Sequence, residues 1–236
     1  MDGSSRRIEL IDAIRGFDLC VMVVHHIFYD LCAFCGLPWV WFSNPVWNVV
    51  HYLSAGTFIL LAGVSSNFSR SNVRRGLRAL AIALVFTLVT TLIGMPIVFG
   101  VLHLLGLCMV FYGLTQAFWQ RLPAWALPVV TLAGTLATAK LVDGYPTATP
   151  HLWMFGLVTP EFYSADYFPL LPWIFVFLFG AWAGKYVRER RLPQWFYAAK
   201  APRLAAIGRR SLLIYVLHQP ILYALTMLGL YLFTKA

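Results

Sequence analysis

The first apolar segment of the chain carries side chains that could move protons. The stretch IELIDAIRGFDLCVMVVHHIFYDL is apolar enough to cross a membrane, yet its interior contains Asp12, Arg15, Asp18, His25, His26 and Asp30. Ionisable side chains are costly in hydrocarbon, so in a membrane helix they indicate a site of function. At about 100° per residue, these six residues fall within an arc of about 140° on a helix. This face must therefore contact protein or water rather than lipid.

The composition indicates which elements position these side chains. Hydrophobic residues make up 60% of the chain and charged residues 11%, with a mean hydropathy of +0.73, which is typical of integral membrane proteins. Apolar segments of about 20 residues predict membrane spans at 8–34, 45–65, 75–95, 97–119, 122–140, 169–187 and 208–232. We therefore predict an all-α polytopic membrane protein, a bundle of about seven transmembrane helices that forms one domain over residues 1–236.

Basic residues fall mainly on one side of such a bundle. That side holds Arg6, Arg7, the RSNVRRGLR loop, Arg121 and the basic segment 185–210, whereas Lys140 and Lys235 fall on the other side. The positive-inside rule then predicts a cytoplasmic N-terminus and an external C-terminus. This topology explains the net charge of +9, which also suits anionic lipid headgroups. We expect no nucleic acid partner.

Helix direction predicts the depth of each polar residue. The first helix runs outward and puts Arg15 in its inner half, with His26 and Asp30 one turn apart in its outer half. That spacing lets a carboxylate orient an imidazole. His51 should lie about 9 Å below the outer surface and His103 at a similar depth, so three histidine-bearing helices are predicted to meet in one layer.

Other polar and aromatic residues have competing interpretations. His25 points roughly 100° away from His26, which favours a structural role for His25. Arg15 could serve a ligand or could simply neutralise Asp12 three residues away. His218 falls in the inner half of the last span, directly before Gln219 and Pro220. The motif LLPWIFVFLFG places Trp173 at the start of a span, where it is a candidate for lining a cavity.

Several motifs together resemble a known family. The pattern RIELIDAIRG, then HHIFYDL, FILLAGVSSNFSRSNVRRG, FGVLHLLG, LLPW and LLIYVLHQPI resembles the heparan-alpha-glucosaminide N-acetyltransferase catalytic domain family, over most of the chain and in the family's order. The Arg15-Gly16 pair with His26 also resembles the first helix of the related bacterial acyltransferase family three proteins. The resemblance implies a membrane-embedded acyltransferase, an acetyl-CoA-dependent N- or O-acetyltransferase, most naturally in a bacterial plasma membrane.

The resemblance also implies the substrates. The donor would be acetyl-CoA or another acyl-CoA on the cytoplasmic side, and the acceptor a small glycan amine or hydroxyl on the outer side. Membrane lipid and a second copy of the chain are further candidate partners, and no metal is expected. A polyanionic coenzyme A nucleotide would suit the basic loop after the second span, and its pantetheine arm could present a thioester at the histidine layer.

Specific residues receive expected roles on this basis. His26 would deprotonate the acceptor while Asp30 holds its tautomer, and His103 would act in the same layer; an acyl-histidine intermediate is the less favoured alternative. Donor-binding candidates are Arg15, Arg70, Arg74, Arg75 and His218, and acceptor-binding candidates are Asn44, His51 and Trp173.

The chain departs from the lysosomal members of the family near the outer surface. Those members carry a histidine before a Trp-Asn pair and an asparagine where His26 stands, whereas this chain has Asn44 before Trp47 and Asn48. The two positions have exchanged residue types, in support of His26. The chain also lacks a large external domain, so heparan itself is not the expected substrate.

Two other functions use similar residues. A proton-coupled multispanning exporter would also need intramembrane Asp, His and Arg residues, although such transporters are often built from recognisable repeats and none is found here. Histidines on facing helices could also ligate haem, which an absorbance spectrum would reveal.

Overall fold

Helices account for the regular structure of the described residues. The computed structural model describes residues 8–144, 147, 149 and 151–235, in which the only β contact is an isolated bridge between Phe99 and Tyr167. The helices are α1 (Glu9–Phe34), α2 (Pro45–Ser66), α3 (Asn72–Leu92), α4 (Val101–Arg121), α5 (Ala126–Gly144), α6 (Leu170–Arg188), α7 (Gln194–Ala198), α8 (Pro202–Gly208) and α9 (Ser211–Lys235), with a 3-10 turn at Trp153–Phe155. Arg6, Arg7 and the side chain of Lys235 lie outside the described residues.

Six helices in the described part of the chain are long and apolar enough to span a membrane. They are α1, α2, α3, α4, α6 and residues Ser211–Phe233 of α9. This confirms a polytopic helical membrane protein. The expected span at 122–140 corresponds to α5, whose apolar part Ala126–Val142 is shorter than the others. Between the spans predicted at 169–187 and 208–232, the structure also contains the short helices α7 and α8.

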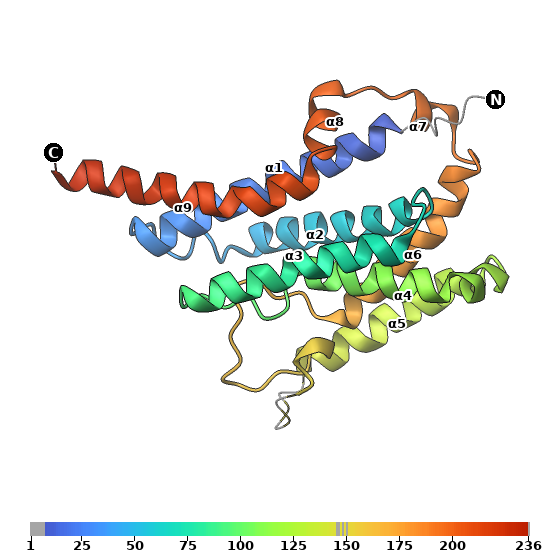
Figure 1. The fold of residues 1–236 in the computed structure, drawn as a ribbon, viewed down its shortest axis with the longest axis horizontal. Helices are drawn as coiled ribbons and strands as arrows, with labels where there is room; N and C mark the ends of the chain where they lie inside the picture. Colours follow the sequence, from blue (N-terminus) through green and yellow to red (C-terminus); the bar gives the residue numbers. More distant parts are fainter. Residues whose placement is uncertain (1–7, 145–146, 148, 150, 236) are drawn as a thin grey trace. The chain divides into compact units, whose positions relative to one another are not determined.

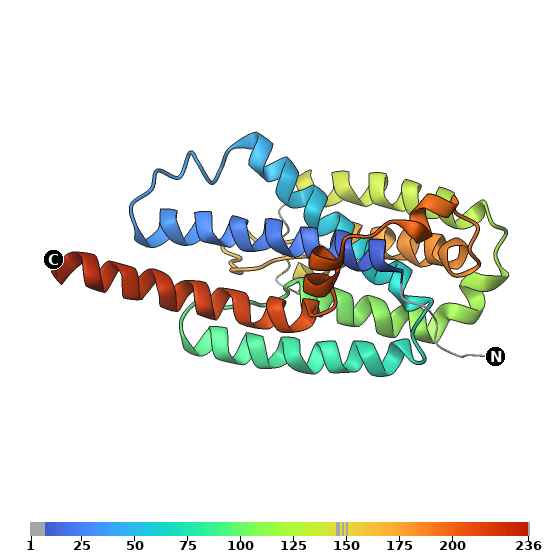
Figure 2. The same ribbon diagram turned by 90° about the horizontal axis from the view of Figure 1, so that it is seen from above.

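The chain folds into two compact units, of which unit 1 comprises Met1–Phe58 and Leu192–Ala236. Figures 1 and 2 show α1 and α9 of this unit side by side, and α1 also contacts α8. Two glycines allow the contact with α8. A Cβ atom on Gly16 would collide with the carbonyl oxygen of Leu204, and one on Gly208 with that of Asp12. The two backbones therefore approach more closely than larger residues would permit.

The α7–α8 connection is also tied to the first turn of α1. Lys200 Nζ lies 3.2 Å from Glu9 Oε2, and the Ala201 N–H donates to Glu9 Oε1 at 3.0 Å. Glu9 thus bonds a segment that follows it by nearly the whole chain. These contacts fix the position at which α9 begins beside α1.

Unit 2 comprises Ile59–Arg191 and contains the end of α2 together with α3 to α6. In Figure 1, α3 lies along α4 and α5 lies along α6, and α4 also contacts α6. Gly63 and Gly180 let α2 and α6 approach closely. A Cβ atom on Gly63 would collide with the carbonyl oxygen of Phe177, and one on Gly180 would collide with that of Leu60. Unit 2 is therefore a bundle whose closest crossing depends on small residues.

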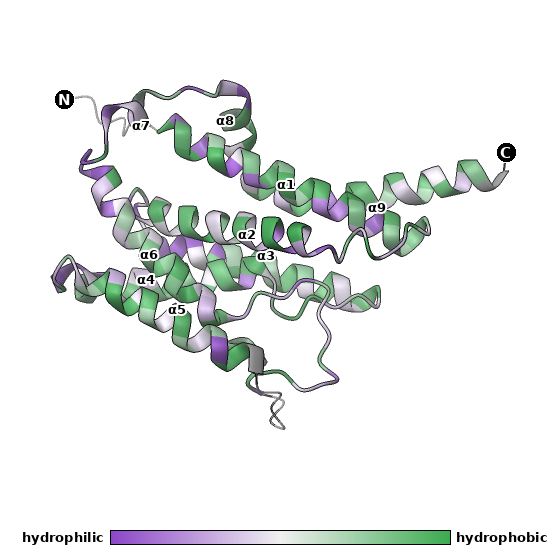
Figure 3. Ribbon diagram, turned by 180° about the vertical axis from the view of Figure 1, so that it is seen from behind, coloured by the Kyte–Doolittle hydropathy of each residue, from purple (hydrophilic) through white to green (hydrophobic). Residues whose placement is uncertain are grey.

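The surface of the helices is largely apolar. Figure 3 shows hydrophobic residues along most of each long helix, with hydrophilic turns interrupting α1. On α3 alone, Leu84, Leu88 and Leu92 are exposed, the last to 78%. An apolar exterior of this kind suits a lipid environment, whereas the polar residues of α1 turn toward its neighbours.

Candidate functional site

Two histidines meet where α1 packs against α9 in unit 1. The ring centroids of His26 on α1 and His218 on α9 lie 4.7 Å apart with an interplanar angle of 76°. We expected His26 in an acceptor site and His218 near the donor nucleotide. The structure instead brings both imidazoles into one cluster.

The bonding of His26 determines which nitrogen can accept a proton. Its Nδ1 lies 2.9 Å from the carbonyl oxygen of Met22, one helical turn back. A carbonyl oxygen can only accept, so Nδ1 carries the hydrogen and the neutral ring has its lone pair on Nε2. The helix backbone therefore holds the neutral His26 ring in the Nδ1–H tautomer, which leaves the Nε2 lone pair to accept a proton.

His218 is held in the same tautomer. Its Nδ1 lies 2.7 Å from the Tyr215 carbonyl oxygen and 3.2 Å from that of Ile214, so Nδ1 again donates. The lone pair is then on Nε2, which is buried and has no hydrogen-bond partner among the described residues. Both imidazoles of the pair are thus proton acceptors on Nε2.

Asp30 completes the cluster through α9. It is 1% exposed, and the Gln219 side-chain N–H donates to its Oδ1 at 2.9 Å. Asp30 Oδ2 and Gln219 Oε1 are buried without partners within the described part of the chain. His26 Nδ1 bonds the Met22 carbonyl oxygen rather than Asp30, so the expected hydrogen bond from His26 Nδ1 to Asp30 is not found.

A second pair of histidines lies next to the first, between α1 and α2. The rings of His25 and His51 stack 4.1 Å apart at 21°, beside Phe42 at 4.7 Å and Trp47 at 5.8 Å from His25. His25 and His26 face different helices, as their 100° separation predicts, but their rings are still only 5.8 Å apart. The sequence interpretation left His25 outside the site, whereas the structure makes it part of a continuous set of four imidazoles from α2 to α9.

The N-terminal half of α1 contains two further polar contacts. Arg15 Nη1 lies 3.0 Å from Asp12 Oδ1, which is the mutual neutralisation considered above. Asp18 is 5% exposed, and the Ser54 hydroxyl approaches its Oδ1 at 3.4 Å. Arg15 therefore has an acidic partner on its own helix.

His103 lies in unit 2, and its ring is fully bonded. The Thr87 hydroxyl donates to the Ile97 carbonyl oxygen at 2.6 Å, so it can only accept from His103 Nε2, which lies 3.1 Å away. The Gly100 N–H donates to His103 Nδ1 at 3.2 Å. One neutral tautomer satisfies all three bonds and leaves no free lone pair. This bonding differs from the catalytic role expected for His103.

The arginines expected to bind the donor have different environments. Arg75 Nη1 donates to the Ser65 carbonyl oxygen at 3.4 Å, and Arg188 Nη1 donates to that of Asn67 at 3.3 Å, so both cover the C-terminal end of α2. Helices favour cations at that end. Arg70 and Arg74 are exposed beside it. Unit 2 therefore has a cationic end around the α2–α3 turn.

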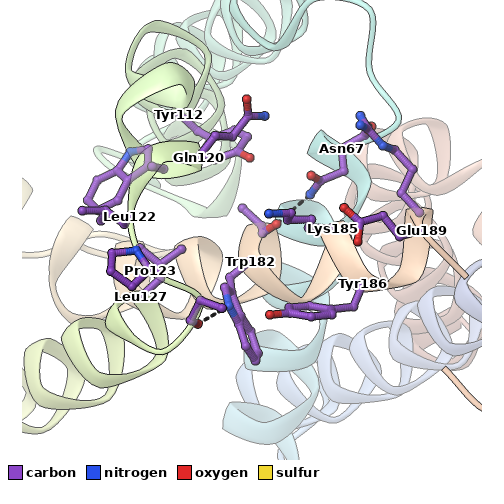
Figure 4. A pocket seen from close by; sticks show the side chains of 14 residues that line it. Asn67, Tyr112, Gln120, Leu122, Pro123, Leu127, Trp182, Lys185, Tyr186 and Glu189 are labelled. Carbon is purple, nitrogen blue, oxygen red and sulfur yellow. Dashed lines mark hydrogen bonds between the residues drawn. The ribbon is translucent and has the colours of Figure 1, made fainter. Parts of the chain in front are cut away.

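A cavity of about 310 Å³ opens at the same end of unit 2. Figure 4 shows Lys185 and Asn67 directed toward it, with the Trp182 and Tyr186 rings along α6; the Asn67 amide donates to the Ala181 carbonyl oxygen at 2.7 Å. Arg188 also lines the cavity. Aromatic rings beside cations suit a ligand with a planar base and phosphate groups. The sequence contained these residues, but no motif joined them.

The remaining two candidates have structural contacts of their own. Asn44 is exposed, and its Oδ1 accepts from the Val46 N–H at 2.9 Å, which caps the start of α2. Trp173 lies in unit 2, where its ring centroid is 5.7 Å from that of Phe168.

Comparison with known proteins identifies one match. The sequence model of the family described as "Heparan-alpha-glucosaminide N-acetyltransferase, catalytic" matches residues 7–220. Neither a curated protein nor a solved structure matches the chain. The matched range contains all the residues of the histidine cluster.

Proposed function

The chain belongs to the heparan-alpha-glucosaminide N-acetyltransferase catalytic family, and on this premise we propose that it transfers an acyl group from acyl-CoA to an amine or hydroxyl of a small sugar. The observation that carries the proposal is the His26–His218 pair, whose Nε2 atoms both carry lone pairs within a membrane-spanning unit. Acyl transfer to an amine or hydroxyl needs such a base, because the attacking atom must lose a proton.

His26 is the proposed general base. The Met22 carbonyl fixes its tautomer, and Nε2 removes the proton from the acceptor as the acceptor attacks the thioester carbon. His51 lies in the neighbouring stack with His25 and would line the acceptor side of the cluster. We assign His103 a structural role at the start of α4, because both its nitrogens are already bonded.

The donor is proposed to bind at the cationic end of unit 2. Acetyl-CoA or another acyl-CoA carries phosphates that suit Arg70, Arg74 and Arg75, and an adenine ring that suits the aromatic wall formed by Trp182 and Tyr186. The double variant Arg74→Ala/Arg75→Ala should weaken acetyl-CoA binding and reduce its salt dependence. Unchanged affinity, measured by titration at two salt concentrations, would instead favour Lys185 and Arg188 as the phosphate ligands.

The orientation follows from the basic segments. We propose seven crossings that include α5, a cytoplasmic N-terminus, an external C-terminus and a place in a bacterial plasma membrane, with both units in one acyltransferase domain. Single cysteines at Ser69→Cys and Gln194→Cys should react with an impermeant thiol reagent only from the cytoplasmic side. Glu161→Cys, in the α5–α6 connection, is the matched control and should react from outside. Labelling of Gln194→Cys in intact cells would contradict this orientation.

One measurement tests the activity itself. Purified protein given acetyl-CoA and an amino sugar should release free thiol and form an acetylated product detectable by mass spectrometry. Absence of both, with proton-driven substrate flux in sealed vesicles, would favour the alternative of a proton-coupled exporter, for which the buried Asp18 carboxylate is the supporting feature.

A further inference from the structure

One polar contact between α1 and α2 is too long for a good hydrogen bond. The Ser54 hydroxyl oxygen lies 3.4 Å from the carbonyl oxygen of Asp18 and 3.4 Å from Asp18 Oδ1. Hydrogen bonds from a hydroxyl to an oxygen are usually about 2.5–3.0 Å long. The hydroxyl is therefore close to two oxygens of one residue without a strong bond to either.

The other serine and threonine hydroxyls of α2 behave differently. Those of Thr57, Ser65 and Ser66 each donate to the carbonyl oxygen four residues back in the same helix, at 2.8, 2.7 and 3.1 Å. This bond satisfies a hydroxyl within its own helix. Ser54 instead directs its oxygen to Asp18 on α1, so that a hydroxyl, a carbonyl and a carboxylate oxygen lie together.

The charge at this contact is unbalanced. Asp18 is 5% exposed, and its Oδ2 is buried with no hydrogen-bond partner in the described part of the chain. Arg15, one turn back on α1, attracts Asp18, but its ion pair is with Asp12. Two carboxylates and one guanidinium leave one negative charge on this part of α1, and a buried charge is costly unless it is compensated.

The spacing of the oxygens indicates the size of a cation that would compensate this charge. Na⁺ has nearly the radius of Ca²⁺, whose oxygen ligands lie at about 2.3–2.6 Å. Neighbouring ligands at right angles around such an ion are about 3.3–3.7 Å apart. Both distances from Ser54 to Asp18 fall in this range. Mg²⁺, with ligands at about 2.0–2.1 Å, would need oxygens about 2.8–3.0 Å apart, and the larger K⁺ would need them farther apart than Na⁺ does.

We propose that Asp18 and Ser54 bind a sodium ion between α1 and α2. The protein ligands are the Asp18 carboxylate, the Asp18 carbonyl oxygen and the Ser54 hydroxyl oxygen, and water completes the coordination. The single charge of Na⁺ balances one carboxylate, whereas a Ca²⁺ site usually contains several. The site does not depend on the proposed acyl transfer.

The bound ion would also support the neighbouring histidine stack. His25 follows Asp18 by two turns of α1, and His51 precedes Ser54 by one turn of α2. The two pairs therefore lie one after the other along the contact between these helices. A cation that joins Asp18 to Ser54 holds the helices at the separation in which His25 stacks on His51.

Thermal unfolding of the full chain in detergent tests the site without an assay of activity. NaCl is compared with KCl and N-methylglucamine chloride at equal ionic strength, because salt alone changes stability by screening. At about ten times its Kd, Na⁺ should raise Tm by roughly 3–6 °C, with a much smaller rise in KCl. No difference between NaCl and KCl would overturn the sodium site and favour neutralisation of Asp18 by a proton.

Two variants test the ligands. Asp18→Asn removes a buried charge and should fold, and its Tm should be the same in NaCl and KCl. Ser54→Ala should need about tenfold more NaCl for the same rise in Tm. Thr57→Ala is the matched control and should respond as the wild type does, since the Thr57 hydroxyl bonds the Leu53 carbonyl oxygen of its own helix.

Binding of radioactive Na⁺ to the purified protein is the second readout, and it does not depend on how the variants unfold. The wild-type protein should retain Na⁺ in the presence of excess K⁺, and Asp18→Asn should not. A sodium response that persists in Asp18→Asn would overturn the site. A loss of affinity in Thr57→Ala as large as that in Ser54→Ala would overturn the role of Ser54 as a ligand.

Discussion

Two regions of this protein contain histidines packed among helices, and the regions differ in how the ring nitrogens are hydrogen-bonded. In unit 2, His103 is bonded through Thr87 on one nitrogen and Gly100 on the other. In unit 1, His26 and His218 each bond a backbone carbonyl through Nδ1, which turns Nε2 toward their shared cluster. The difference teaches that the residue type and its depth do not make a site. A buried histidine can act as a base only if one ring nitrogen still has a lone pair after the hydrogen bonds to neighbouring residues have formed.

The largest expected effect is the loss of catalysis in His26→Ala. Removal of a general base typically lowers the rate by about 10² to 10⁴, while donor affinity should be unchanged because the proposed binding site of the donor nucleotide does not include His26. Thiol release from acetyl-CoA and a separate binding titration would measure the two effects. Ile27→Ala, the adjacent residue with an exposed apolar side chain, is the control and should retain its rate. An active His26→Ala protein would remove the contrast between the two regions.

The next effect concerns stability rather than rate. His103→Ala leaves the Gly100 N–H and the Thr87 hydroxyl without the imidazole, so the free energy of unfolding should fall by about 1–3 kcal/mol. The rate per folded molecule should stay near that of the wild type. Denaturant unfolding in detergent and specific activity measure the two quantities, with Leu114→Ala on the exposed face of α4 as the control. A loss of rate without a loss of stability would restore His103 as a catalytic candidate.

Alkaline pH should also lower the free energy of unfolding of the region around His103, because Tyr167 lies in a neighbouring loop. The Tyr167 hydroxyl donates to the Trp153 carbonyl oxygen at 2.6 Å, and burial raises the pKa of Tyr167 from 10.0 to about 12. The folded state therefore favours the neutral phenol, and this contribution to stability is present below pH 10 and lost as the pH rises toward 12. Unfolding free energies of wild type and Tyr167→Phe across this window should converge at high pH. A constant difference would contradict the assignment.

The smallest expected effect is that of His25→Ala. His25 stacks on His51, and no ring contact joins it to His218 in the described part of the chain, so its removal should lower the rate by less than about tenfold. The rates of His25→Ala and His26→Ala, measured in the same assay, compare adjacent residues of one helix. Equal loss in both variants would mean that the four imidazoles act as a structural group, and that the pairing of His26 with His218 has no special role.

The sequence predicted the long helices well because their signal is local. Apolar length alone located α1 and α2 within a residue of their ends, and placed the other long helices to within about five residues. It did not reveal α8, which is short and basic, although Pro202 at its start and Gly208 at its end are ordinary helix-boundary residues. The close approach of α8 to Gly16 depends on a contact across most of the chain, which no local pattern contains.

The candidate site was predicted less completely, and hydrogen bonding is the reason. Spacing on α1 identified His26 and Asp30 but paired them with each other, whereas each found its partner elsewhere, in Met22 and Gln219. His103 was included by depth alone, since Thr87 gives no sequence signal of its bond to the imidazole. Side-chain direction and the competition for each lone pair are properties of the folded chain.

The pairing of Asp30 with Gln219 has a consequence for biosynthesis. The two residues are 189 positions apart, so α1 is synthesised well before α9. Until α9 inserts, α1 presents a carboxylate and an imidazole without their α9 partners, and a helix with such groups is poorly tolerated in lipid. We therefore expect the insertion of α9 to stabilise α1 in the membrane, because α9 supplies the side chains that contact Asp30 and His26.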